Sequence, residues 1–142
     1  MPKRTAGQRD LDDADYQRLL HFRTGLRRFL HWSQEQATAA GLTTSQHQLL
    51  LAIRGHSDPR GPTVGEAAGY LLLRHHSAVG LVDRAAEAGL VVRHQDQDDH
   101  RVVRLRLTPR GSQLLRQLTT LHFEELSRLG PQMRPIWDGL EE

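Results

Sequence analysis

The sequence contains no cysteine and no long apolar run among its 142 residues. Without a thiol, disulfide bridges, thiolate zinc sites and cysteine nucleophiles are excluded, and such a chain suits a reducing compartment. The longest apolar stretch, residues 70–73, is far too short to cross a bilayer. The basic residues near the N-terminus are not followed by the apolar segment of a signal peptide. We therefore expect a cytoplasmic protein with no membrane partner.

Lysine is nearly absent as well, because Lys3 is the single lysine among 19 basic residues and all the others are arginines. The formal net charge is only +2, although the pI is about 9.6, since arginine stays protonated at high pH. Arginine is favoured where a planar group makes two bonds to phosphate or guanine. A genome rich in G and C would produce the same bias, so composition alone does not choose between these causes.

The chain has an ordinary globular composition, with 37% hydrophobic and 25% charged residues, and its length fits one compact unit. Apolar residues at helical spacing predict a long helix from residue 11 to about residue 40. Thr43 and Gln46 form a capping box, which predicts a second helix that ends at Gly55. A turn rich in proline and glycine follows over residues 56–62.

Two short helices with almost no linker come next. Thr63 and Glu66 form another capping box at the start of the first of them. The second is predicted over about residues 74–88 and ends at Gly89. This close succession is typical of a helix-turn-helix.

The rest of the chain predicts a hairpin and a helical end. Residues 90–93 and 102–107 read as strands around a polar turn. Thr108 and Pro109 start another long helix, which we expect to break at residues 130–131 and to be followed by a short helix. The fold class is therefore mainly α with a small β-hairpin wing. In this single unit, 1–142, a winged helix-turn-helix (43–108) is flanked by long dimerisation helices (11–40 and 109–142).

The start of the helix near residue 74 is the main candidate for contact with DNA. Its polar side chains can donate hydrogen bonds to phosphates or base edges in the major groove, and a glycine allows close approach. Taken alone, the segment is equally compatible with two packed helices that have a solvated polar end. The candidate DNA-binding residues in this region are Thr63, Arg74, His75, His76, Ser77, Gly80 and Arg84.

The hairpin turn offers a further candidate, Arg101, whose side chain can enter a narrow minor groove. Three aspartates beside phosphate need another role, and we expect Asp99 to stabilise the wing by pairing with Arg101 or Arg84. A calcium loop is the alternative, but the central glycine and terminal glutamate of such a loop are missing. A zinc site that includes His47 and His122 stays open, beside the simpler interpretation that both are half-buried interface residues.

Enzymatic motifs are missing from the sequence. It contains no glycine-rich phosphate loop, no Gly-x-Ser-x-Gly elbow and no His-Glu-x-x-His. We therefore expect no enzyme and no metal or other cofactor. The alternative to a DNA-binding regulator is a winged-helix module that binds proteins without reading DNA, which the modest net charge leaves open.

The ordered motifs together resemble the MarR family of multiple-antibiotic-resistance regulators. The resemblance rests on residues 42–46, 63–67, 81–84, 89–91, 96–101 and 105–111, and it spans roughly residues 16–140. It implies a homodimer that binds a pseudo-palindromic operator in double-stranded DNA, usually as a repressor that a small aromatic or phenolic effector releases. It also implies that Arg101 is the wing arginine and Asp99 the wing aspartate. By analogy, the effector cleft would lie near His31, Trp32 and His47.

Overall fold

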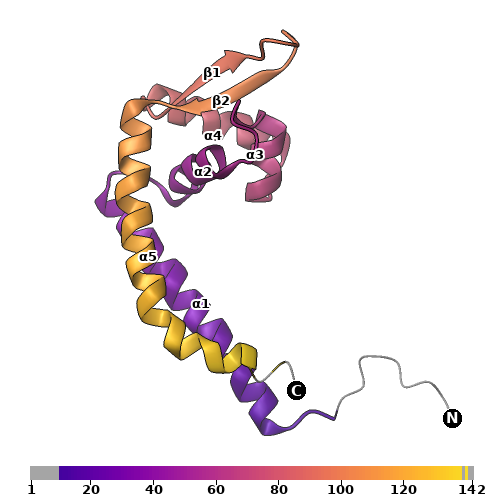
Figure 1. Cartoon of the computed structure of the whole chain (residues 1–142), viewed down its shortest axis with the longest axis vertical. Helices are drawn as coiled ribbons and strands as arrows, with labels where there is room; N and C mark the ends of the chain where they lie inside the picture. The colour runs from indigo at the N-terminus through magenta and orange to yellow at the C-terminus, as the bar shows by residue number, and fades with distance from the viewer. Residues whose placement is uncertain (1–9, 139, 141–142) are drawn as a thin grey trace, which may run out of the picture. The chain divides into compact units, whose positions relative to one another are not determined.

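The computed structural model describes residues 10–138 and 140, which form two compact units. One unit combines residues up to Trp32 with residues from Glu124 onward, and we call it the helix-pair unit. The other unit, Ser33–Phe123, is the winged-helix unit. Helix α1 (Asp13–Ala39) and helix α5 (Pro109–Asp138) each contribute residues to both units (Figure 1).

The helix-pair unit consists of the first part of α1 and the second part of α5. The rings of Phe22 and Trp137 lie with their centroids 5.3 Å apart. A Cβ atom at Gly25 would lie 3.1 Å from the sulfur of Met133, so the two helices approach closely at this glycine. Two helices cover only a narrow stripe of each other, and many large apolar side chains stay exposed. These are Leu11, Tyr16, Leu19, Leu20, Leu26, Leu30, Leu126, Trp137 and Leu140.

The predicted break at residues 130–131 and the separate short helix after it are wrong, because α5 continues to Asp138 with Pro131 and Pro135 inside it. A proline removes one hydrogen bond of the helix and crowds the preceding turn, and a sequence pattern reads it as a stop. The two prolines are four residues apart and therefore share one helix face. Ile136 is buried on this part of α5, and such packing outweighs the local propensity.

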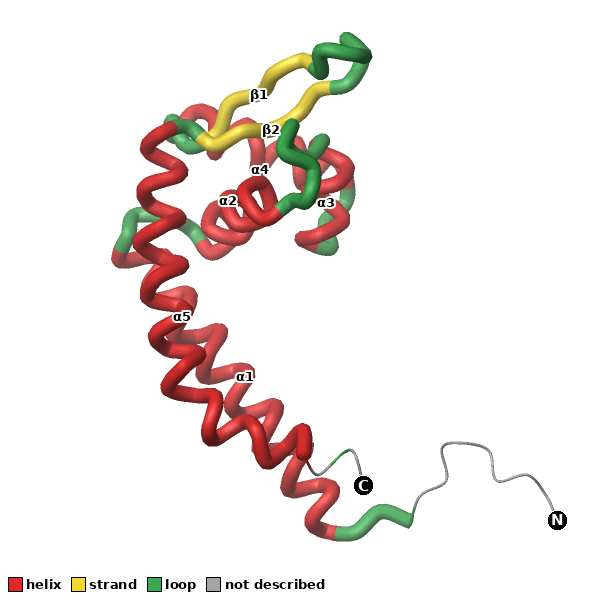
Figure 2. Tube along the Cα trace, viewed as in Figure 1, coloured by secondary structure: helices red, strands yellow, loops and turns green. Residues whose placement is uncertain are grey.

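In the winged-helix unit, three helices pack against a two-stranded sheet (Figure 2). The helices are α2 (Thr44–Gly55), α3 (Val64–Leu71) and α4 (His75–Glu87). Strand β1 (Val91–Gln95) runs antiparallel to β2 (Val103–Leu107), with Val91 opposite Leu107. The core of this unit is made of aliphatic side chains, with Leu49, Leu50, Val82, Leu90, Leu105 and Leu118 almost fully buried. The predicted winged helix-turn-helix is confirmed.

Side-chain caps fix where the helices of this unit begin. Thr43 and Thr63 each accept a hydrogen bond from the backbone N–H three residues on, and both predicted capping boxes are complete. The hydroxyl oxygen of Thr108 accepts from the N–H of Gly111 and so caps α5. These caps satisfy backbone donors that the first turn of a helix otherwise leaves unpaired.

The turn between α3 and α4 is as short as the sequence predicts. Leu72 takes a left-handed conformation with φ of 55°, and its N–H caps the carbonyl ends of α3. Arg74 is already the N-cap of α4. Since only Leu72 and Leu73 separate the last residue of α3 from this N-cap, the angle between the two helices is set by very few dihedrals.

Candidate nucleic-acid interface

The first turn of α4 presents a polar surface. His75, His76 and Ser77 are all exposed, and the Arg74 N-cap makes no side-chain hydrogen bond to the helix. The backbone N–H groups of this turn therefore lack the side-chain cap that α2 and α3 have. A helix start of this kind carries partial positive charge and is a favourable place for a phosphate.

The opposite face of α4 is buried in the core. Ala78, Leu81, Val82 and Ala85 are its buried residues. Because these side chains fix the rotation of the helix about its axis, His75, His76 and Ser77 have a defined direction outward. A Cβ atom at Gly80 would lie 3.3 Å from a guanidinium nitrogen of Arg84, so Arg84 covers this glycine.

An ion pair that the sequence did not predict joins α4 to the hairpin. Arg93 of β1 donates to the carboxylate of Asp83 in α4. The sequence indicated Asp83 only as a family motif residue, and Arg93 only as a strand residue. The pairing depends on how β1 lies beside α4, which no local pattern reveals.

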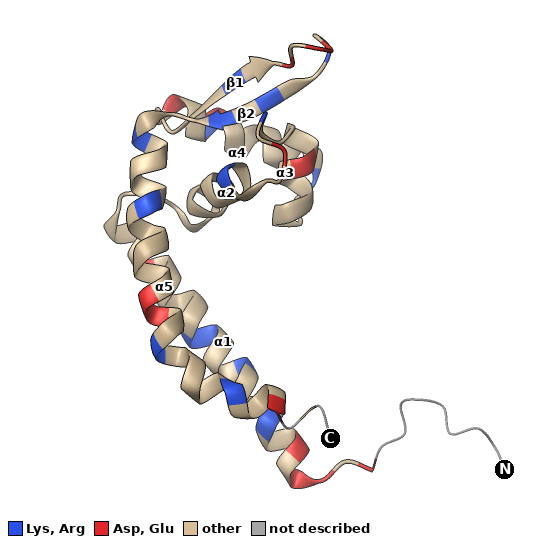
Figure 3. Cartoon of the chain, in the orientation of Figure 1, with Lys and Arg blue, Asp and Glu red and all other residues tan. Residues whose placement is uncertain are grey.

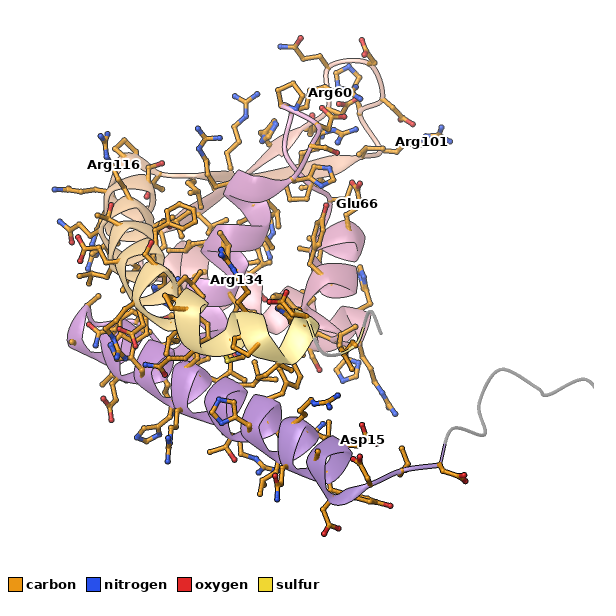
Figure 4. All side chains as sticks on the ribbon, turned by 60° about the horizontal axis from the view of Figure 1, so that its bottom comes forward. Asp15, Arg60, Glu66, Arg101, Arg116 and Arg134 are labelled. Carbon is orange, nitrogen blue, oxygen red and sulfur yellow. The ribbon has the colours of Figure 1, made fainter. Side chains whose placement is uncertain are left out.

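Arg101 lies beside the hairpin turn, with 91% of its side chain exposed (Figure 4). Asp99 holds it in place: the guanidinium donates to both carboxylate oxygens at 3.1 Å, and the backbone N–H of Arg101 donates to one of them. These hydrogen bonds lower the pKa of Asp99. The predicted partner of Asp99 is thus Arg101, and among the described residues no bond joins Asp99 to Arg84.

The buried carboxylate at the root of the hairpin is a second feature that sequence reasoning missed. Asp96 is only 5% exposed and accepts from the Nε of Arg104 at 2.8 Å. It also accepts from the backbone N–H groups of Asp98 and Asp99, at 3.2 and 3.1 Å. The bond from Arg104, followed by the bond from Asp99, keeps the pKa of Asp96 below its usual value. A single carboxylate therefore shapes the turn that carries Arg101.

The loop before α3 clasps this root. Arg60 donates to Asp58 at 2.8 Å and lies 3.4 Å from Asp96 (Figure 4). Arg104 donates to the carbonyl of Gly61 at 2.9 Å. The backbone N–H of Leu105 also donates to the carbonyl of Pro62, at 2.8 Å. The hairpin is thus tied to the segment that leads into Thr63 and α3.

Acid should weaken this root in a defined range of pH. A carboxylate whose pKa is lower in the folded state stabilises the fold above its unfolded pKa, about 4, and loses that contribution as pH falls through its folded pKa. We expect the difference in unfolding free energy between wild type and Asp96→Asn to be constant from pH 7 to pH 5 and to shrink below about pH 4. Urea denaturation across this range measures the difference.

The matched control is Asp98→Asn, because Asp98 is 87% exposed and touches the cluster only at its edge, 3.5 Å from Arg60. Its difference from wild type should be small throughout. A difference for Asp96→Asn that is absent at pH 7, or equal to that of Asp98→Asn, would show that the buried carboxylate does not stabilise the hairpin.

The three candidate effector residues divide between the units. His31 and Trp32 belong to the helix-pair unit, where Trp32 stacks on Phe29 and lines a cavity of about 330 Å³. His47 belongs to the winged-helix unit. It is buried against His122 with ring centroids 5.0 Å apart, and its pKa is lowered by burial and then by His122. The Nε2 of His122 lies 2.7 Å from the hydroxyl of Ser33.

Two structural surveys bear on other kinds of function. Within residues 10–138 and 140, no three or more His, Asp or Glu side chains gather closely enough to hold a metal ion. None of the described helices is long and apolar enough to span a membrane. The acidic turn at 96–101 instead spends its carboxylates on arginines and backbone N–H groups, and Figure 3 shows both charges at the hairpin.

Comparison with known proteins points to one family. The family model for the MarR family matches residues 40–102. A helix-turn-helix transcriptional regulator of Bacillus subtilis, YsmB, is 36% identical over 64 residues. That match covers 45% of this chain and 44% of YsmB, so the chain matches less than half the length of this curated relative.

Solved structures share the fold over most of the chain. CouR from Rhodococcus jostii RHA1, bound to p-coumaroyl-CoA, is 24% identical with a TM-score of 0.67, and the match covers 91% of this chain and 92% of CouR. A Staphylococcus aureus MepR–DNA complex is 20% identical with a TM-score of 0.66, covering 87% of this chain and 85% of MepR. At these identities the likeness establishes the fold.

Proposed function

Because residues 40–102 place this chain in the MarR family, we propose that it is a transcription regulator that binds double-stranded DNA as a homodimer. The observation that carries the proposal is the pair of exposed elements in the winged-helix unit. The first turn of α4 is polar and uncapped, and Arg101 extends from a hairpin that is tied to α3. In winged-helix proteins such elements contact the major groove and the minor groove, respectively.

The homodimer is supported by the surface of the helix-pair unit. Two helices leave large apolar side chains such as Tyr16 and Leu20 more than 60% exposed. An exposed apolar stripe on a long helix is stabilised by burial against another helix pair. A second copy supplies such a pair, and its two-fold symmetry matches an operator with two inverted half-sites.

Regulation by a small effector is the finer part of the proposal. The fold relative CouR was solved with a phenolic thioester bound, which supports an aromatic or phenolic effector for this chain as well. We propose that the effector releases the regulator from its operator, which makes the protein a repressor. The cavity lined by Trp32 and the buried pair of His47 and His122 are the places where such a ligand is to be sought.

Removing the wing arginine tests the minor-groove contact. Arg101→Ala should weaken binding to an operator duplex roughly tenfold, since it removes one guanidinium from the groove. Arg101→Lys should be intermediate, because lysine keeps the charge and loses the two-point contact with Asp99. Fluorescence anisotropy with labelled duplex from the region upstream of the coding sequence gives the affinities.

Arg27→Ala is the matched control, because Arg27 is an exposed arginine on α1 in the helix-pair unit. It should bind DNA as the wild type does. If Arg101→Ala and Arg27→Ala were indistinguishable while the wild type bound specifically, the wing would have no role in binding. If none of the three proteins bound the duplex, a winged-helix protein-interaction module would be the better description.

A further inference from the structure

A groove on the winged-helix unit is not used by the proposed DNA contacts. It comprises a cavity of about 570 Å³ and an adjoining cavity of about 240 Å³, which share Arg54, Leu107 and Ser112. The larger cavity lies between the end of α2, the end of β2 and the first half of α5. Its volume falls in the usual range for sites that bind small molecules. We call it the Arg54 groove.

The groove has cationic walls without a matching carboxylate. Arg54 and Arg116 line the larger cavity, and among the described residues neither guanidinium lies in an ion pair. Figure 4 shows Arg116 on the part of α5 that belongs to this unit. The smaller cavity adds Arg106, and its one acidic residue, Asp58, is already held by Arg60. Net positive charge is therefore left in the lining.

The remaining lining is apolar or already hydrogen-bonded. Leu107, Leu115 and Phe123 supply apolar surface, and Phe123 is 66% exposed. The hydroxyls of Thr119 and Thr120 donate to the carbonyls of the preceding helical turn, at 2.7 and 2.9 Å. Their hydrogens are thus committed within α5. The strong donors that remain for a ligand are the two guanidinium groups, which favour a carboxylate, sulfonate or phosphate.

From this arrangement we propose that the Arg54 groove binds an amphiphilic anion. One acidic group is held by Arg54 and Arg116, and an apolar body of about the size of two fused rings covers Leu115 and Phe123. A phosphate of duplex DNA would use the arginines but would leave the apolar wall uncovered. The site does not depend on the proposed DNA binding, since none of its residues belongs to α4 or to the hairpin turn.

The test compares two probes of the same shape, 2-naphthoate and the neutral 2-naphthamide, by isothermal titration into the full chain at low salt. We expect 2-naphthoate to bind at least about tenfold more tightly than the amide, because charge-assisted bonds to guanidinium are the stronger kind. The double variant Arg54→Gln/Arg116→Gln should remove this preference and leave amide binding unchanged. Phe123→Ala should weaken both probes.

Arg23→Gln/Arg27→Gln is the control, because it removes two exposed arginines from α1 and keeps the same net charge as the test variant. It should bind 2-naphthoate like the wild type. Equal affinity for the two probes, or unchanged naphthoate binding in Arg54→Gln/Arg116→Gln, would overturn the proposal. So would a variant that loses operator affinity or dimer mass and keeps naphthoate binding, since the arginines would then serve DNA or the partner subunit.

Discussion

Gly61→Ala is expected to lower the free energy of unfolding by about 3 kcal/mol, since a strained backbone and a steric clash each cost about 1–3 kcal/mol. Gly61 has φ of 91°, in the left-handed region that disfavours a side chain. A Cβ atom there would lie 2.1 Å from the carbonyl oxygen of Leu105 in β2, and a backbone atom cannot move aside alone. Urea denaturation followed by circular dichroism measures the loss.

The expected loss reaches function through the clasp at the root of the hairpin. The carbonyl of Gly61 accepts from Arg104, and the next residue, Pro62, accepts from the N–H of Leu105. Pushing this loop off β2 breaks both bonds and releases the hairpin from α3. Operator affinity should therefore fall in Gly61→Ala even at a temperature where the chain is folded.

Gly55→Ala is the control for this prediction. Gly55 ends α2, has no left-handed φ, and has no atom within 4 Å of the position that a Cβ would take. Its substitution should change stability by less than about 1 kcal/mol. Equal stabilities for Gly55→Ala and Gly61→Ala would mean that the loop does not need to lie against β2.

The double variant His75→Ala/His76→Ala is expected to weaken operator binding about 100-fold, if each imidazole makes one base contact worth about tenfold. Both side chains are exposed at the start of α4, so thermal stability should change little. Binding to duplex of unrelated sequence should also change little, because that binding comes from phosphate contacts. Competition between operator and unrelated duplex separates the two effects.

His21→Ala serves as the control, because His21 is exposed on α1, outside the winged-helix unit. It should keep the preference for the operator. If His75→Ala/His76→Ala kept the full preference as well, the start of α4 would not read the bases. Equal losses on operator and on unrelated duplex would assign the two histidines to phosphate contact instead.

The local part of this fold could be predicted from the sequence. The capping boxes at Thr43 and Thr63 gave the starts of α2 and α3, and Thr108 gave the start of α5. Caps are readable because their partners lie three residues away. The pairing of Asp99 with Arg101 was predictable for the same reason.

Contacts between distant segments could not be predicted in this way. Asp96 looked like one of three similar aspartates, and only the fold places it beside Arg104 and Arg60, which are 8 and 36 residues away. The prolines in α5 were read as a stop because the buried packing of Ile136 has no local signal. The Arg54 groove depends likewise on three elements that meet only in the folded chain.

The central claim is that α4 and the hairpin hold this protein on DNA. The most direct measurement is the affinity for the upstream operator duplex at salt concentrations between about 50 and 200 mM. The account predicts that the logarithm of the binding constant falls linearly with the logarithm of salt concentration. In Arg101→Ala the slope should be smaller by about one. Salt-independent binding, or no binding at the lowest salt, would contradict the claim.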